Sequence, residues 1–193
     1  AHFEFWRDRS HIGREVAIAD VTEAWSVIAV AGPEARSKLM NVLGDAWHGT
    51  LQTLTHMGVA EGEWHGELRL LRASFSGELA YEVHCRAPEA VTLWQALIDS
   101  GLQPYGIEAV DVLRVEKGYL SAAEINGQTT PADLAMTAML NANPNCVGRA
   151  LLDRPAFLAP DRPGLVGLRA CDGQSRFLAG AQITLPHEKV RSC

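Results

Sequence analysis

The spacing of apolar residues over the first 120 positions predicts a domain of class α+β. Runs rich in β-branched or alternating apolar residues indicate strands at 16–20, 25–31, 65–75 and 79–85. Helical spacing indicates helices at the N-terminus, at 33–43, at 88–100 and at 106–117. Strands follow one another in pairs without an intervening helix. We therefore expect a mostly antiparallel sheet with helices on one face.

The clearest turn signal lies between the third and fourth predicted strands. Ser76-Gly77-Glu78 separates two strand patterns, which predicts a β-hairpin with a short loop. Residues 45–62 show no regular pattern and are expected to be irregular.

Prolines mark a change in organisation after residue 152. A helix is expected at 131–140 and a helical turn at 147–152, before the spaced Pro155, Pro160 and Pro163. Strands expected at 165–169 and 181–185 would begin a C-terminal β-barrel, and the short polar tail makes that barrel look truncated. The predicted division is 1–152 for the first domain, 153–163 for a linker and 164–193 for the start of the barrel.

Composition and charge narrow the possible partners. Hydrophobic residues make up 47% and charged residues 21% of the 193 positions, as in a folded globular protein. The net charge of −6 and the lack of a basic run argue against nucleic acid. No apolar run is long enough to predict a membrane span, and no export signal is present, so we expect a cytoplasmic protein. The chain starts without methionine inside a predicted helix, from which we expect upstream sequence to be missing.

General catalytic motifs are missing from the sequence. There is no H-E-x-x-H, phosphate loop, G-x-G-x-x-G or G-x-S-x-G pattern. The four cysteines form no C-x-x-C pair, so neither a zinc site nor a disulfide framework is expected. Motifs alone would leave a folded α+β domain with no metal.

Two charged residues still suggest a binding site. Glu82 lies in an apolar strand and shares a face with His84, where its carboxylate could accept two parallel N–H bonds from a heterocycle. The alternative is a solvated sheet face. Arg114 lies in the helix at 106–117, where it could grip an anionic ligand group. The alternative is an ion pair on the helix surface with Asp111, three residues earlier.

Several segments together resemble the glycine-cleavage T-protein superfamily. They are 74–83, 104–109, 112–118, 129–134 and 147–152. Four further segments are similar to the aminomethyltransferase-like domain of sarcosine oxidase α subunits, at the C-terminal end of that subunit: 3–6, 20–25, 31–36 and 161–168. The resemblance covers nearly the whole chain.

The resemblance implies a tetrahydrofolate-binding domain of a sarcosine-oxidase-like enzyme. Such a domain captures the imine or formaldehyde left by oxidative N-demethylation and yields methylene-tetrahydrofolate. It implies that Glu82 binds the pterin, that Arg114 contacts a polar or anionic part of the ligand, and that Phe75 packs beside the flat ring. The catalytic aspartate of the family would precede residue 1, so no catalytic residue is expected here. FAD, FMN and NAD are expected only in parts or subunits outside this chain, and the partners would be the other sarcosine oxidase subunits.

Two departures from the family pattern leave other functions open. Val110 stands where T-proteins often carry a second arginine, and 141–146 replaces a lysine-rich stretch. Either change could weaken contacts to an anionic ligand. The alternatives are a non-catalytic module for subunit assembly and a truncated free aminomethyltransferase. In any of these cases we expect the fragment alone to be inactive.

Overall fold

The computed structural model describes residues 2–10, 13–125, 127–142, 144–146, 148–178 and 180–181. Its internal contacts divide the chain into two compact units, 1–120 and 121–193, and each is described here by itself. The domain boundaries expected near 152 and 163 stay predictions, because compactness alone does not show where a family domain ends.

The first unit is built on one antiparallel sheet of four strands. The strands are β1 (Trp25–Ala31), β2 (Val59–Glu63), β3 (Glu67–Leu71) and β4 (Ala80–Arg86), in the spatial order β1-β4-β3-β2. All three neighbouring pairs are antiparallel. The α+β class and the antiparallel sheet expected from the sequence are therefore confirmed.

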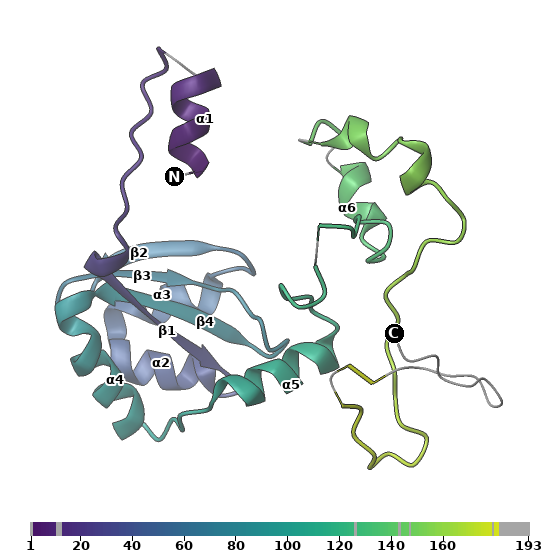
Figure 1. Cartoon of the computed structure of the whole chain (residues 1–193). Helices are drawn as coiled ribbons and strands as arrows, with labels where there is room; N and C mark the ends of the chain where they lie inside the picture. Colours follow the sequence, from purple (N-terminus) through teal and green to yellow (C-terminus); the bar gives the residue numbers. More distant parts are fainter. Residues whose placement is uncertain are drawn as a thin grey trace. The chain divides into compact units, whose positions relative to one another are not determined.

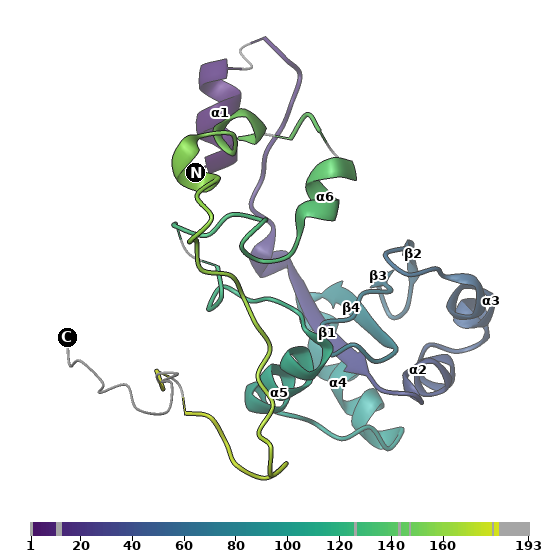
Figure 2. The ribbon, with the colours of Figure 1, turned by 90° about the vertical axis from the view of Figure 1, so that its right-hand side faces the viewer.

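Three helices cover one face of this sheet. They are α2 (Ala35–Leu43), α3 (Asp45–Thr53) and α4 (Ala90–Asp99). Figure 1 shows α2 and α3 behind the sheet, and Figure 2 shows the same pair to one side of the strands. One hydrophobic core forms between the layers, and it draws on all three helices and on β1, β3 and β4: Val30, Ala35, Leu39, Leu43, Trp47, Leu51, Leu68, Leu70, Tyr81, Val83, Cys85, Leu93 and Leu97.

The central strand β4 shows why the sheet has two different faces. Tyr81 and Val83 are fully buried toward the helices, while Glu82 and His84 alternate with them and point to the opposite face. A slip of one residue would bury the two polar side chains, so the core specifies the register. Burial of Cys85 in the same core raises the pKa of its thiol.

Sequence-based expectations were wrong in two places near the sheet. Residues 16–20, expected as a strand, belong to an extended stretch with no strand pairing among the described residues. Residues 45–62, expected to be irregular, contain α3 and all of β2 except Glu63. Gly49 and the exposed Glu61 interrupt the apolar pattern there. Tertiary contacts that no local pattern reveals stabilise this segment. One is the hydrogen bond that the Trp47 indole donates to the Glu63 carbonyl at 3.1 Å.

The predicted hairpin is confirmed as a pairing but not as a tight turn. β3 pairs with β4 from Leu68↔Cys85 to Leu71↔Glu82, and residues 72–79 connect them as a longer loop. The strand β3 is also shorter than the expected 65–75. The tight turn joins β2 to β3 instead, where Glu63 pairs with Glu67.

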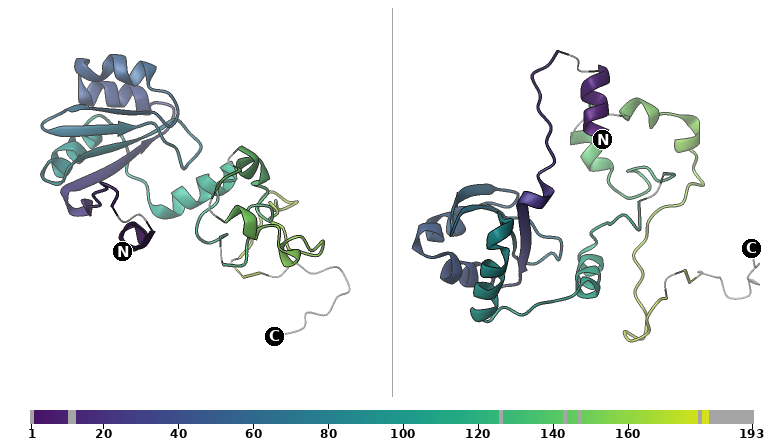
Figure 3. Two further views of the ribbon diagram at one scale, coloured as in Figure 1. Left: turned by 90° about the horizontal axis from the view of Figure 1, so that it is seen from above. Right: turned by 60° about the vertical axis from the view of Figure 1, so that its left-hand side comes forward.

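Two more helices belong to the first unit. The helix α1 (His2–Ser10) precedes the extended stretch that leads into β1 (Figure 3). No residue of α1 is buried. The helix α5 (Ile107–Lys117) ends at Gly118, which adopts the left-handed conformation with φ 81°. The expected helix boundaries at 106–117 are confirmed.

The described residues of the second unit show little regular structure. Among them are α6 (Thr137–Ala142) and short 3-10 turns at Arg149–Leu151 and Pro155–Phe157. The helix expected at 131–140 therefore begins later. Residues 165–169 were wrongly expected to form a strand: Val166 and Leu168 are exposed, and this stretch has no strand pairing. Nearly all of the second expected strand, 181–185, lies outside the described residues, so a truncated barrel is not shown.

Candidate functional site

The face of the sheet opposite the helices carries the predicted ligand residue Glu82. We call this the open face, defined by the outward residues of β1, β4 and β3. Cross-strand pairing arranges two rows of three, which are Ala29–Glu82–Leu71 and Val27–His84–Arg69. It also pairs Trp25 with Arg86, whose guanidinium forms an ion pair with Glu67 of β3. Glu82 therefore has apolar cross-strand neighbours, whereas charged side chains surround Trp25 at the other end of the face.

At the charged end of the open face, the arginine side chains contact an aromatic ring and acidic side chains of the same sheet. Arg86 and Arg69 lie over the Trp25 ring at 4.3 and 5.1 Å from its centroid. Arg69 also donates to Glu61 at 2.7 Å, and Arg86 forms an ion pair with Glu67. Since both guanidinium groups already have acidic and aromatic partners, this end is suited to holding the strands together.

The Glu82 carboxylate has a different environment. Its cross-strand neighbours, Ala29 and Leu71, have no side-chain hydrogen-bonding groups. Its side chain is 44% exposed, and its recorded side-chain partner is His84, whose Nε2 lies 3.4 Å from Oε2. The carboxylate is therefore accessible and retains acceptor capacity for another molecule.

Arg114 is almost completely buried, with a residue exposure of 7%. Its Nε donates to Asp111 at 3.1 Å, and another guanidinium nitrogen donates to the Tyr119 carbonyl at 3.2 Å. The ion pair with Asp111, one of the two readings left open by the sequence, is thus present. By contrast Val112 and Val115 on the same helix are exposed, an inversion of the usual burial pattern.

Phe75 is linked to Arg114 through Tyr119. The Phe75 and Tyr119 rings stack with centroids 6.4 Å apart, and Arg114 binds the Tyr119 backbone. The loop of residues 72–79 also approaches α5 closely at Gly77, where an added Cβ would lie 2.7 Å from Lys117 Cδ. The structure therefore brings two of the three predicted site residues together around one tyrosine, while the recorded contact of Glu82 is with His84.

An apolar groove of about 460 Å³ lies beside the edge strand β1. Its lining comes from β1, from α4 and the segment after it, and from the start of α5. Val110, the position at which a second arginine was expected from the resemblance, lines this groove. Glu82, Arg114 and Phe75 are not among its lining residues, so their convergence on one cavity stays a prediction.

The comparison with protein families identifies the chain. The model of the GCVT N-terminal domain matches residues 2–143, well over half of the sequence. The chain belongs to the GCVT N-terminal domain family. The open face and the helix α5 both lie inside the matched region of this GCVT-family chain.

Curated relatives of this GCVT-family chain include sarcosine oxidase α subunits and aminomethyltransferases. The sarcosine oxidase subunit alpha of Rhizobium meliloti (strain 1021) is 39% identical over 94% of this chain and 19% of the relative. That of Corynebacterium sp. (strain P-1) is 30% identical over 93% of this chain and 19% of the relative. The aminomethyltransferase of Rubrobacter xylanophilus is 33% identical over 77% of this chain and 41% of the relative. The chain thus spans about a fifth of the length of its sarcosine oxidase relatives.

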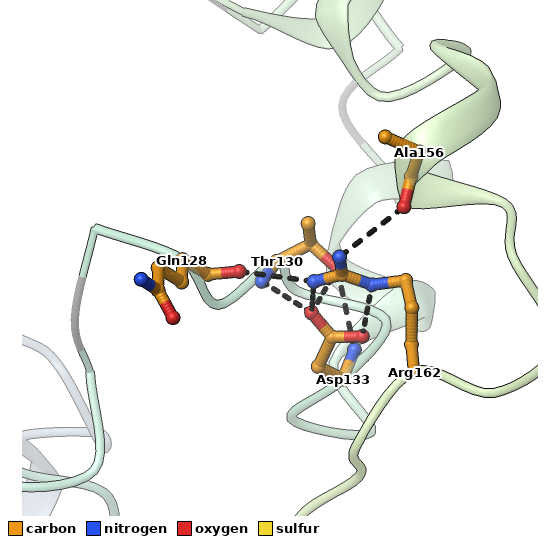
Figure 4. A network of polar contacts seen from close by, with 5 residues as sticks. All are labelled: Gln128, Thr130, Asp133, Ala156 and Arg162. Carbon is orange, nitrogen blue, oxygen red and sulfur yellow. Dashed lines mark hydrogen bonds and ion pairs between the residues drawn. The ribbon is translucent and has the colours of Figure 1, made fainter.

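The second unit of this GCVT-family chain contains a polar network that the sequence analysis did not find. Arg162 donates to Asp133 Oδ1 at 2.9 Å, to the Gln128 carbonyl at 2.9 Å and to the Ala156 carbonyl at 3.3 Å (Figure 4). Thr130 donates to Asp133 from its backbone N–H at 2.7 Å and from its hydroxyl at 2.9 Å. These contacts hold the pKa of Asp133 well below its usual range, with Arg162 as the largest cause.

A local signal for this network exists in the sequence. Thr130 and Asp133 have the spacing in which a hydroxyl residue and an acidic residue three positions later bond reciprocally. Nothing local predicts that Arg162 joins them from 29 positions away. The network fixes one loop of the second unit. The charged groups of Asp133 and Arg162 are bonded to each other and to neighbouring groups of the chain.

The described part of the chain contains neither a metal-binding cluster nor a membrane-spanning helix. No group of three or more His, Cys, Asp or Glu side chains is arranged to hold a metal ion there. No helix in that part has both the length and the apolar character needed to span a bilayer.

Proposed function

We propose that this chain forms the tetrahydrofolate-binding domain of a sarcosine-oxidase-like enzyme. The enzyme would oxidatively demethylate sarcosine, and this domain would help to convert the resulting imine or formaldehyde into methylene-tetrahydrofolate. The observation that carries the proposal is the match of almost the entire chain to sarcosine oxidase α subunits. The accessible carboxylate of Glu82 on the open face supports it.

The residues around Glu82 fit the pterin part of tetrahydrofolate. A pterin presents an amino group and a ring N–H side by side, and an ionised carboxylate can accept both in parallel. Ala29, which pairs with Glu82 from β1, is small and exposed, which leaves room for a flat ring above the sheet beside Glu82. Leu71 offers apolar contact on the other side of Glu82.

Arg114 and Phe75 have supporting roles in this proposal. Phe75 is 46% exposed and would pack beside the ligand, with Tyr119 stacked on its other side. Arg114 would contribute positive charge toward a polar or anionic part of the ligand while remaining bonded to Asp111. Tetrahydrofolate supplies the amine nitrogens that accept the one-carbon unit, and the chain's own residues bind and orient it.

The remaining parts of the enzyme would lie in other segments and subunits. FAD, FMN and NAD would bind there, and the family's catalytic aspartate would come from sequence before residue 1. The domain would assemble with the other sarcosine oxidase subunits in the cytoplasm. The fragment by itself would then be inactive.

A second candidate is a module kept only for subunit assembly. Val110 favours this second candidate. It lines an apolar groove at the position where the resemblance led us to expect a second arginine. A truncated free aminomethyltransferase receives less support, since the match to the Rubrobacter enzyme covers 77% of the chain and the match to the Rhizobium subunit 94%.

Product analysis of the full-length enzyme complex separates the first two candidates. Sarcosine is oxidised with and without tetrahydrofolate, and formaldehyde and methylene-tetrahydrofolate are measured. The proposal predicts that tetrahydrofolate diverts the carbon from formaldehyde, and that Glu82→Ala restores formaldehyde without slowing sarcosine consumption. Glu63→Ala, an exposed glutamate of β2, is the matched control and should behave like wild type. An assembly module would give formaldehyde under every condition.

A further inference from the structure

His84 and Glu82 form a pair on β4 that none of the family motifs includes. They are two positions apart on a strand, so both side chains leave the same face of the sheet. The distance between His84 Nε2 and Glu82 Oε2 is 3.4 Å. The His84 side chain is 20% exposed and that of Glu82 is 44% exposed. The imidazole therefore lies deeper in the open face than the carboxylate it contacts.

The neighbours of His84 direct its hydrogen bond toward Glu82. Val27 faces it from β1 and has no side-chain hydrogen-bonding group. Arg69 faces it from β3, but its Nε is bonded to Glu61 at 2.7 Å and its guanidinium lies over Trp25. Within the described part of the chain, the imidazole ring of His84 forms its hydrogen bond with Glu82.

We propose that His84 is a positioning residue for ligand binding by Glu82. With its hydrogen on Nε2, the imidazole donates to Oε2 and fixes the torsions of the glutamate side chain. An ionised carboxylate has about four acceptor positions, so one bond from His84 leaves enough for two parallel N–H donors of a flat heterocycle. This inference rests on the proposed function, because it gives His84 a role only where Glu82 binds a ligand.

The expected benefit of this contact is preorganisation. A free glutamate side chain loses rotamer freedom when a ligand immobilises it, and a hydrogen bond made beforehand removes part of that loss. Without His84, we expect the dissociation constant of the ligand to be about 3- to 10-fold higher. The effect should pass entirely through Glu82.

Calorimetric titration of full-length protein with 5-formyltetrahydrofolate tests this inference. His84→Val removes the donor while keeping a good strand former, and His84→Phe keeps a flat ring without nitrogen. His84→Gln places an N–H at a reach similar to that of Nε2. We expect the Val and Phe variants to bind about 3- to 10-fold more weakly and the Gln variant to recover most of the affinity. Unfolding midpoints measured in parallel identify any variant that fails to fold.

A double-mutant cycle with Glu82→Ala distinguishes positioning from packing. Replacing His84 by Val or Phe in the Glu82→Ala protein should cause no further loss of affinity. An equal loss in both backgrounds, or a Gln variant as weak as Val, would overturn the positioning role and leave the proposed function intact. Wild-type affinity in Glu82→Ala would overturn the proposed function and this inference together.

Discussion

Gly77 provides a quantitative test of how the loop of residues 72–79 packs against α5. Its φ of 85° lies in the left-handed region, where an L-residue costs about 1–2 kcal/mol. A Cβ at this position would also lie 2.7, 2.8 and 3.0 Å from Cδ, Cγ and Cβ of Lys117. The Lys117 Cβ cannot move without the helix, so overpacking should add about 1–3 kcal/mol. Gly77→Ala should therefore destabilise the protein by about 2–5 kcal/mol in total.

Gly118 is the matched control for the conformational part of this cost. Its φ is 81°, but an added Cβ would meet no atom within 4 Å. Gly118→Ala should therefore lose only about 1–2 kcal/mol. Lys117→Ala combined with Gly77→Ala should recover part of the steric cost, since it removes two of the three close atoms.

Urea unfolding followed by far-UV circular dichroism measures these free energies. We expect the order wild type, Gly118→Ala, Gly77→Ala from most to least stable, with partial rescue of the last by Lys117→Ala. Equal losses in the two alanine variants, or no rescue, would show that the loop does not rest on Lys117. The stacking of Phe75 on Tyr119 would then also be in doubt, because the same loop carries Phe75.

Two further predictions concern stability in each unit. The depressed pKa of Asp133 means that its stabilising effect is present above the ordinary value of 3.8 and is lost as the pH falls below it. Asp133→Asn should thus lower the thermal midpoint at pH 7 and should lose less stability than wild type between pH 7 and pH 3. An acid-induced loss in Asp133→Asn as large as that of wild type would contradict the role of the Arg162 pair. In α4, Leu93→Ala should cost about 2–5 kcal/mol because the side chain is fully buried. Val91→Ala, 78% exposed, should change stability by no more than about 0.5 kcal/mol; similar losses in both would contradict the observed orientation of the helix.

The elements with strong local signals could be predicted from the sequence. The β-branched run of β1, the alternation of β4 and the glycine that ends α5 each have a local physical cause, and all three were found. The helix and strand within 45–62 were not predicted, because Gly49 and Glu61 weaken the apolar pattern. The stability of this segment comes from contacts such as the hydrogen bond of Trp47 to Glu63. Residues 16–20 had the composition of a strand, but composition cannot supply the neighbouring strand that pairing requires.

The candidate site was predicted less completely than the fold. Strand alternation put Glu82 on the face away from the core. The i, i+3 spacing offered the Asp111–Arg114 ion pair as one of two interpretations, and the structure contains that pair. The stacking of Phe75 on Tyr119 joins residues 44 positions apart, which no periodicity reveals. His84 shares a face with Glu82 by alternation, but no sequence pattern predicts that its Nε2 lies 3.4 Å from the carboxylate.

Binding of tetrahydrofolate to the full-length protein is the most direct test of the central claim. Calorimetric titration of wild type, Glu82→Ala and the control Glu63→Ala measures whether the open face holds the ligand. Two charge-assisted hydrogen bonds are lost with Glu82, at about 1.5–3 kcal/mol each in favourable cases, so affinity should fall at least ~10-fold. The control should bind like wild type. Equal affinity in wild type and Glu82→Ala, or no binding to wild type, would contradict the account.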